Sequence, residues 1–363
     1  MTTIAGTENR KFHPVSKSPV HACFIVIPRF NMLTVTGLIE PLRVANYLLS
    51  EELYSWDYRS PQGDHVVASN GMALDCLDLE GDETPTPDLI FVCGSWGAEH
   101  FKNTKLTNWL RKEERRGAEL VGVEMGVYLL ARAGLLKGKT ITTHWSLKAG
   151  LEEEFPDIDV REQLYTWDGK IYSVAGGSAS IDFATQLVAK HHGEGIASEI
   201  SNQLLHNTNR PATASQRLAV TEVAREIHPL VKQALALIES SMEEPMSVPA
   251  LCSSLSASQR NLERLFKREV GCSLVQYSRL VRLQYARVLL SSTRLSIREV
   301  SVACGFNSLP YFSQSFLKCF GRKPSQYRQA WPEDDPAPSW PGTLYSFVQK
   351  SQKGKLNQIT MLP

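Results

Sequence analysis

Residues 21–192 alternate between short apolar runs and stretches with helical spacing of their apolar positions. The runs have the character of buried strands in parallel sheets, and they are His21–Pro28, Leu89–Cys93, Glu119–Val123, Ile141–Thr143 and Ile171–Ser173. Helical spacing follows over Leu38–Leu49, Leu106–Arg116, Gly126–Ala133 and Ile181–His191. Strands that alternate with helices predict an α/β domain, in which helices cover both faces of a parallel sheet.

Residues 229–331 have an almost wholly helical pattern that contains an internal repeat. The segment Ser247–Tyr277 aligns with Ser296–Tyr327, and the alignment pairs Gly271 with Gly321. Each copy predicts a short helix, a tight turn, a second helix and a glycine stop, which is the layout of a helix-turn-helix unit. A helix over 278–291 is expected to join the two units, so that they enter successive major grooves.

The second copy shows local signals for its helices. Ser296 and Ser308 are expected to cap the two helices, and Gly305 permits the turn between them. Phe312 and Phe316 lie four residues apart and are expected to face inward. The sequence therefore predicts an all-α domain with two helix-turn-helix units behind the α/β domain.

The two predicted domains differ in net charge. Between Pro229 and Trp331 there are 14 Lys and Arg against 6 Asp and Glu, whereas the rest of the chain holds 25 basic and 32 acidic residues. A basic third favours a polyanion partner, double-stranded DNA. The alternative is a helical bundle whose basic character is incidental.

The predicted second helices of the units carry the candidate DNA contacts. Arg260, Asn261, Arg264, Ser313 and Gln314 are expected at base edges, because Arg, Gln and Asn form paired hydrogen bonds there. Lys267, Arg268 and Lys318 are expected at phosphates, which position the protein without specifying sequence. Ser258, Gln259, Leu309 and Pro310 complete the predicted exposed set.

Composition sets broad limits on the class of protein. The chain has 363 residues, of which 42% are hydrophobic and 21% charged, as in a globular protein of two or three domains. The sequence contains no apolar run long enough to span a membrane and no secretory signal before His21. Seven cysteines without a framework favour the reduced cytoplasm. The expected parts are a disordered arm (1–20), an α/β domain (21–206), a linker (207–228), a DNA-binding domain (229–331) and a flexible tail (332–363).

The repeat resembles the DNA-binding domain of the AraC/XylS family of transcription regulators. The stretch ACGFNSLPYFSQSFLKCFGRKPSQYR matches the signature of that family. The resemblance implies a seven-helix domain and a regulator that is commonly dimeric and recruits RNA polymerase. An architectural DNA-bending protein is disfavoured, because it needs no large α/β domain.

The α/β region resembles the class I glutamine amidotransferase-like (ThiJ/PfpI) domain, with a flavodoxin-like sheet. The whole of residues 21–330 resembles the GlxA-type branch, in which this domain precedes an AraC-type domain; GLIEPLRVAN, ARAGLLKGKTITTHW and SVAGGSASIDFATQLVAKHHG carry the likeness. In enzymes of the superfamily a cysteine occupies the strand-to-helix elbow. Here Glu124 occupies it, and Thr34 approximately replaces an acidic residue usual after the first strand. The sequence therefore predicts a catalytically inactive ligand-sensing domain; the alternative is an active amidase or peptidase-like enzyme with an accessory DNA-binding domain.

The predicted ligand pocket lies at the carboxyl ends of the strands, where open α/β sheets bind ligands. Its expected residues are Thr34, Ser95, Trp96, Glu124, Met125, His144, Trp145 and Gly177. A carboxylate between tryptophans suits a cation, and regulators resembling this one control catabolism of arginine, carnitine or betaine. A cationic amine or quaternary ammonium effector is therefore expected. The alternative is that helix amides satisfy Glu124 and both tryptophans pack as core.

Four other side chains leave alternatives open. Cys93 is expected to be a buried structural thiol rather than a redox sensor, and His144 either lines the pocket or bonds within the core. His191 and His192 are expected to favour a helix C-terminal dipole rather than bind a metal. No cofactor is predicted. Association is expected to be homodimeric, through the α/β domain.

Overall fold

The computed structural model describes residues 19–63, 65–81, 85–95, 97–216, 228–241, 244–293, 295–320 and 322–329. The chain divides into two compact units: Met1–His144 with Gln163–Ala214, and Trp145–Glu162 with Ser215–Pro363. The predicted tail and nearly all of the predicted arm lie outside the described residues, as do residues 217–227 of the predicted linker. The domain boundaries therefore stay predictions.

A six-stranded sheet forms the centre of the first unit, in the order β2-β1-β5-β6-β10-β9. The parallel strands are β1 (Val20–Val26), β2 (Tyr54–Arg59), β5 (Leu89–Gly94), β6 (Glu119–Glu124) and β10 (Ile171–Val174). Taken in chain order, these five strands have the flavodoxin-like arrangement 2-1-3-4-5, as the resemblance to the amidotransferase-like domain implied. The predicted strand Ile141–Thr143 is not part of this sheet. Strand β9 (Tyr165–Asp168) pairs antiparallel with β10 at the edge.

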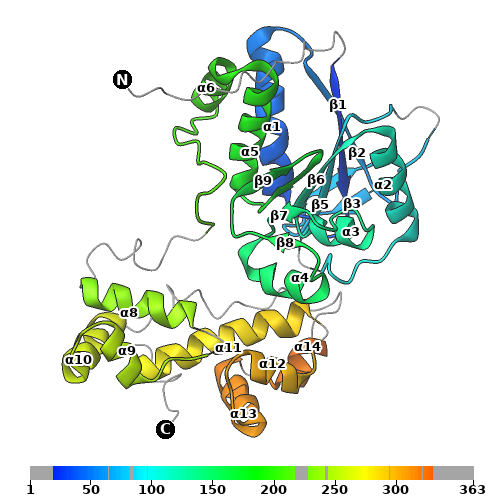
Figure 1. Ribbon diagram of the computed structural model, residues 1–363. Helices are drawn as coiled ribbons and strands as arrows, with labels where there is room; N and C mark the ends of the chain where they lie inside the picture. The colour runs from blue at the N-terminus through cyan, green and yellow to red at the C-terminus, as the bar shows by residue number, and fades with distance from the viewer. Residues whose placement is uncertain are drawn as a thin grey trace, which may run out of the picture. The chain divides into compact units, whose positions relative to one another are not determined.

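Helices cover both faces of this sheet (Figure 1). On one face lie α1 (Met32–Leu49) and α5 (Ala179–His192), with α6 (Glu194–Gln203) beside them. The other face carries α2 (Thr104–Arg116) and α3 (Gly126–Arg132). One apolar core lies between the sheet and the α1–α5 layer, where Phe24, Phe91 and Phe183 are fully buried. Burying about 25 cal/mol per Å² of apolar surface holds these layers together.

Short elements complete the first unit and the segment 145–162. A two-stranded antiparallel sheet is formed by β3 (His65–Val67) and β4 (Ala73–Asp75), and β7 (Thr140–Ile141) follows α3. The segment 145–162, which is grouped with the second unit, holds η1 (Trp145–Leu147), α4 (Lys148–Glu154) and β8 (Asp159–Val160).

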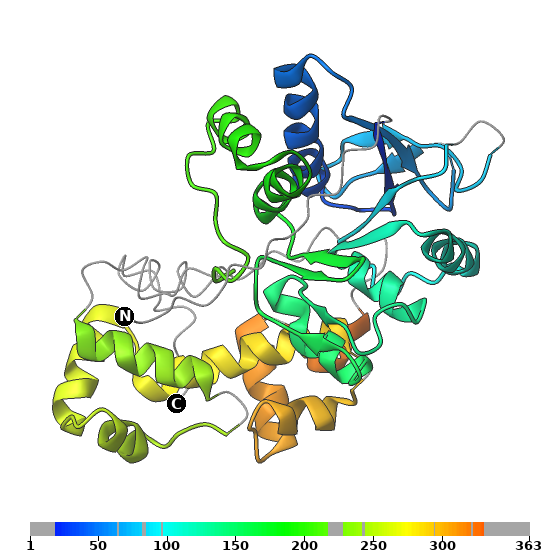
Figure 2. The same cartoon turned by 45° about the horizontal axis from the view of Figure 1, so that its top comes forward.

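Seven helices occupy the described part of residues 228–329, as the AraC resemblance implies. They are α8 (Pro229–Ser240), α9 (Val248–Ser254), α10 (Gln259–Val270), α11 (Leu274–Ser292), α12 (Ile297–Ala303), α13 (Leu309–Phe320) and α14 (Pro324–Gln329). The long helix α11 connects the two helix-turn-helix units, α9–α10 and α12–α13 (Figure 2). Its first half contributes Tyr277 to one apolar core, and its second half contributes Leu289 to another.

The local signals read from the second repeat copy are confirmed. Ser296 caps α12 in a reciprocal capping box with Glu299, and Gly305 has a φ of 69° in the turn. The Ser308 hydroxyl accepts a hydrogen bond from the Tyr311 amide at 3.4 Å, and Phe312 is fully buried. The helix-turn-helix prediction is therefore correct down to its caps.

Some expected element bounds were wrong. Helix α1 begins at Met32 rather than Leu38, because Asn31 accepts a hydrogen bond from the Leu33 amide and caps the helix there. Strands β2, β3, β4, β8 and β9 were not predicted, and β9 makes the sheet mostly rather than wholly parallel. Within the described residues, no helix has both the length and the apolar character needed to cross a membrane.

Candidate functional site

The turn between β6 and α3 is a tight elbow. Glu124, the last residue of β6, has a φ of 55°, in the left-handed region that non-glycine residues rarely adopt. Helix α3 starts two residues later at Gly126, where an added Cβ would lie 1.7 Å from the Val92 carbonyl oxygen of β5. Glycine is therefore required for the close approach of α3 to the sheet, and the elbow presents Glu124 at the carboxyl edge, as predicted.

The carboxyl group of Glu124 is buried and incompletely paired. Glu124 is 8% exposed, and its Oε1 accepts a hydrogen bond from the side-chain nitrogen Nδ2 of Asn31 at 3.1 Å. Among the described residues, Oε2 has no hydrogen-bond partner. Burial raises the pKa of this carboxyl to about 7, although the Asn31 hydrogen bond acts to lower it. At neutral pH the group is thus divided between its protonated and ionised forms.

Loops from neighbouring strands pack closely on the elbow. Gly176, after β10, has a φ of 92°, and a Cβ there would lie 2.3 Å from Cγ of Glu124. The next amide, Gly177, donates to Oγ1 of the buried Thr34 at 2.9 Å. The Thr143 hydroxyl donates to the Glu124 carbonyl at 2.8 Å. The ends of β6 and β10 and the first turn of α1 therefore meet around one carboxyl group.

The structure brings part of the predicted pocket together. Thr34, Glu124 and Gly177 are joined as described, but Thr34 lies in the first turn of α1 rather than in the loop. Ser95 and Met125 are buried on the same edge, after β5 and β6. The membership of these residues in a ligand pocket stays a prediction.

The other three predicted pocket residues are His144, Trp145 and Trp96. His144 follows β7; burial lowers its pKa to about 4, so its ring is neutral at pH 7. Trp145 begins η1, where its amide donates to Oε1 of Gln216 at 2.7 Å, and it is grouped with the second compact unit. Trp96 lies outside the described residues.

A fully buried carboxylate lies close to this edge. Asp182, in the first turn of α5, accepts hydrogen bonds from the Arg210 guanidinium at 2.6 and 3.0 Å and from the Arg210 amide at 2.8 Å. The Nε2 atom of His206 lies 2.9 Å from Oδ1 of the same carboxylate. Arg210 also donates to the Ser178 hydroxyl at 2.9 Å. This Asp182–Arg210 pair fastens residues 206–210 to the loop that packs on Glu124.

The predicted DNA-contacting residues lie on the exposed faces of α10 and α13. All twelve are exposed except Ser313, which is half-buried. Arg264 donates to Oδ1 of Asn261 at 3.0 Å, and Gln259 donates to Oε1 of Glu263 at 2.9 Å. Ser258 caps α10 by accepting from the Asn261 amide at 3.4 Å. The opposite face of α10 buries Leu262 and Phe266, so the polar face is free of the core.

Comparison with known proteins agrees with both halves of the chain. Residues 21–190 match the DJ-1/PfpI family, and residues 251–330 match a helix-turn-helix domain. Over 323 residues the chain is 33% identical to the HTH-type transcriptional regulator GbdR of Pseudomonas aeruginosa, covering 89% of this chain and 88% of that protein. It is 35% identical to CdhR of the same species over 319 residues, 88% of this chain and 94% of CdhR. With GlxA of Rhizobium meliloti it shares 32% identity over 307 residues, 84% of this chain and 94% of GlxA.

The chain belongs to the family of HTH-type transcriptional regulators that includes GbdR, CdhR and GlxA. This regulator therefore joins a DJ-1/PfpI-like sensing domain to an AraC-type DNA-binding domain, as the sequence predicted. At its elbow stands Glu124, in place of the cysteine that enzymes resembling this domain carry there. The alternative in which amides of α3 satisfy this carboxyl does not hold, because its hydrogen bond comes from Asn31.

Sequence reasoning missed two side chains whose hydrogen bonds organise this edge of the sheet. Asn31 was placed at the end of the first strand but not in the pocket or at a helix start, although an asparagine immediately before an apolar helical run is a common signal for a helix start. Arg210 was placed in the linker, where its charge gave no indication of the buried Asp182 that it contacts, 28 residues away in sequence.

The remaining histidine and cysteine interpretations have different outcomes. Cys93 is buried and its pKa is raised by burial, which favours the structural thiol. His191 is half-buried, with Nδ1 2.8 Å from the Tyr54 hydroxyl, and partial burial lowers its pKa to about 4. A neutral ring adds no charge to the end of α5, so the dipole interpretation is wrong for His191. In the described parts of the chain, no group of three or more His, Cys, Asp or Glu side chains is arranged to hold a metal ion.

Proposed function

We propose that this regulator senses a cationic amine or quaternary ammonium compound at the carboxyl edge of its sheet and responds by changing how it binds promoter DNA. The unpaired, buried Oε2 of Glu124 carries this proposal. A buried carboxyl oxygen without a partner is costly, and a bound cation would remove that cost. The names of the relatives support the role in transcription.

Several parts of this proposal extend beyond the ligand. The regulator acts in the cytoplasm as a homodimer that recruits RNA polymerase. Its sensing domain performs no hydrolysis, because a glutamate stands where related enzymes use a cysteine nucleophile. An amidase activity that disappears in the Glu124→Ala variant would favour the enzyme alternative instead.

The ligand proposal predicts a specific pH dependence of affinity. A cation binds the ionised form of Glu124, whose pKa in the free protein is about 7. Protonation therefore competes with binding below neutral pH, and affinity for a quaternary ammonium compound should fall up to about a hundredfold between about pH 8 and about pH 5. The nearby groups stay constant over this range, because the His144 pKa is about 4 and the Cys93 pKa is raised. Titration calorimetry with a panel of amines at several pH values measures this.

Two variants serve as the test and its control. Glu124→Gln should abolish both the binding and its pH dependence. Glu99→Gln, at an equally buried carboxyl that accepts from the Gly97 amide at 2.8 Å, should leave both nearly unchanged. Amine binding that survives Glu124→Gln unchanged would remove this residue from the site.

We further propose that α10 and α13 read DNA in the major groove, with Arg264 at a base edge and Lys267 at a phosphate. Both are exposed, but the bond from Arg264 to Asn261 orders its guanidinium for paired hydrogen bonds, whereas the Lys267 ammonium is a mobile point charge.

This assignment predicts different losses for the two side chains. Arg264→Ala should cost about 1–3 kcal/mol on the preferred sequence and relax selectivity at one base. Lys267→Ala should weaken all sequences alike and reduce the salt dependence of binding by about one phosphate contact. Fluorescence anisotropy on a set of single-base operator variants at several salt concentrations separates the two effects. Equal, sequence-independent losses would show that Arg264 is not a reader.

A further inference from the structure

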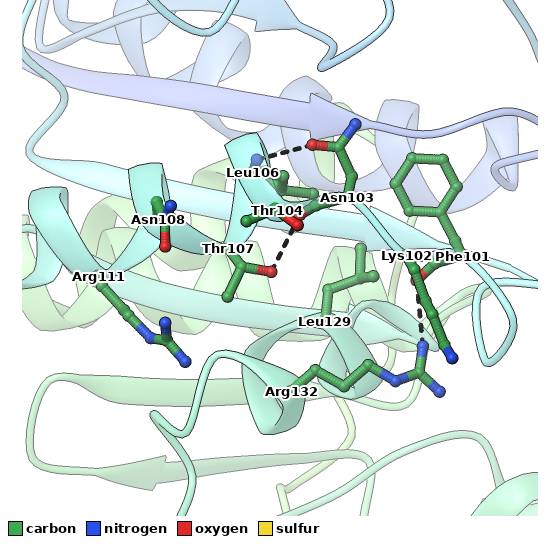
Figure 3. A pocket seen from close by; sticks show the side chains of 10 residues that line it. All are labelled: Phe101, Lys102, Asn103, Thr104, Leu106, Thr107, Asn108, Arg111, Leu129 and Arg132. Carbon is green, nitrogen blue, oxygen red and sulfur yellow. Dashed lines mark hydrogen bonds between the residues drawn. The ribbon is translucent and has the colours of Figure 1, made fainter.

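A cavity lies in the sensing domain, between α2, α3 and the loop that leads from β5 to α2 (Figure 3). Its volume is about 170 Å³, roughly the space of six water molecules. None of the residues predicted for the ligand pocket lines it. Thr104, Thr107 and Arg111 follow one another along one face of α2 and line the cavity, while Arg132 reaches it from the end of α3.

The cavity is lined by three basic side chains, Lys102, Arg111 and Arg132, and by no acidic one. Arg132 is fixed in place, because its Nη1 donates to the Phe101 carbonyl at 3.1 Å and to the Ala98 carbonyl at 3.3 Å. The nearby Glu99 acts on Arg132 electrostatically but does not line the cavity, and burial raises the pKa of its carboxyl. The lining therefore carries three positive charges and no negative one, and the Lys102 and Arg111 side chains are exposed.

Arg111 keeps donors for a ligand. Its Nε donates to the Ala133 carbonyl at 2.7 Å, which holds the guanidinium at the end of α3. For its two terminal nitrogens, and for the Lys102 ammonium, the described residues provide no acceptor. An arginine held by Nε presents its terminal nitrogens as a fork, which matches two oxygens of a carboxylate or phosphate.

We propose that this cavity binds a small dianion through the Arg111 fork, with Thr107 beside it and the Lys102 ammonium at the opposite end of the lining (Figure 3). Three positive charges around a small cavity favour a ligand with two negative charges over a neutral or cationic one. The site is distinct from the elbow, which offers a carboxyl group and suits the opposite charge. It adds a second ligand to the sensing domain, bound where α2 meets the end of the helix that follows the elbow.

Calorimetry on the full-length protein tests this with two probes, inorganic phosphate and succinate, at about pH 8 and constant ionic strength set with chloride. Saturable binding of either probe supports the site; binding of phosphate alone points to a phosphorylated ligand, and binding of succinate alone to a dicarboxylate. Since the basic DNA-binding domain also attracts anions, the assignment depends on variants. Arg111→Gln should weaken binding about tenfold or more, because a hydrogen bond between charged groups is lost.

Arg115→Gln is the matched control. Arg115 lies one turn further along α2, carries the same charge and is absent from the cavity lining. Arg115→Gln should leave binding of both anionic probes unchanged. Glu124→Gln should also leave it unchanged, although the same variant should abolish amine binding. The outcomes for the cavity and for the elbow are therefore independent. Equal weakening by Arg111→Gln and Arg115→Gln, or no saturable binding up to about 10 mM of either probe, would overturn the proposal.

Discussion

Replacing Gly126 by alanine is expected to prevent stable folding of the sensing domain, at a cost above about 4 kcal/mol. The added Cβ would lie 1.7 Å from the Val92 carbonyl oxygen and 2.6 Å from its carbon. Both neighbours are backbone atoms of a central strand, so no side chain can rotate to make room. Helix α3 would have to move away from β5, which would open the elbow that carries Glu124. Circular dichroism on heating would report the loss, and hydrogen exchange would place it in β5, β6 and α3.

Gly195→Ala is the matched control for this prediction. Gly195 lies in the first turn of α6, has no atom within 4 Å of an added Cβ, and has no left-handed φ. Alanine there should be neutral or should stabilise the domain by about 0.5–1 kcal/mol, because it reduces the freedom of the unfolded chain. Similar stability for the two variants would mean that α3 does not approach β5 as closely as described.

Asp182→Ala is expected to destabilise the sensing domain by about 3–5 kcal/mol. Asp182 is fully buried, and its removal leaves the Arg210 guanidinium and the His206 ring without their buried carboxylate. Residues 206–210 would then detach from the start of α5. We expect faster amide hydrogen exchange over residues 206–210 together with a lower midpoint of urea unfolding. Asp182→Asn keeps the shape and one acceptor, so its loss should be smaller.

The Glu40–Arg43 pair provides the comparison for Asp182. It is also a carboxylate–arginine pair, with an Nη2-to-Oε2 distance of 2.7 Å, but the two side chains are 43% and 52% exposed. Glu40→Ala should therefore cost less than about 1 kcal/mol and leave the hydrogen exchange of residues 206–210 unchanged. Comparable losses from the two substitutions would contradict the claim that burial makes the Asp182–Arg210 pair important.

The central strands were predictable because they are buried on both faces and therefore consist of uninterrupted apolar runs. Strand β5 is buried along its whole length and was found within one residue of its end. Strand β2, with the sequence YSWDYR, was not predicted. It lies at the edge of the sheet, where polar residues are tolerated, and four of its six residues are half-buried. Strand β9 escaped for the same reason, since its outer residue Trp167 is 37% exposed.

The helix-turn-helix units were predictable because their determinants are local. Caps such as Ser296 and Ser308, and the turn glycine Gly305, act within a few residues of the chain. The repeat gave each signal twice, and helical spacing placed Phe312 and Phe316 in the core. Which exposed side chains touch DNA depends on the partner, so that assignment stays a prediction.

The sequence by itself determined the fold class, the two helix-turn-helix units, the position of Glu124 at the elbow and the role in transcription, because each is carried by residues close together in the chain or by a motif. Only the tertiary structure decided what surrounds that carboxyl. Asn31 reaches Glu124 across 93 residues, and Arg210 reaches Asp182 across 28. Such partners are chosen by how strands and helices stack in space, and the pKa of Glu124 follows from the burial that this stacking produces.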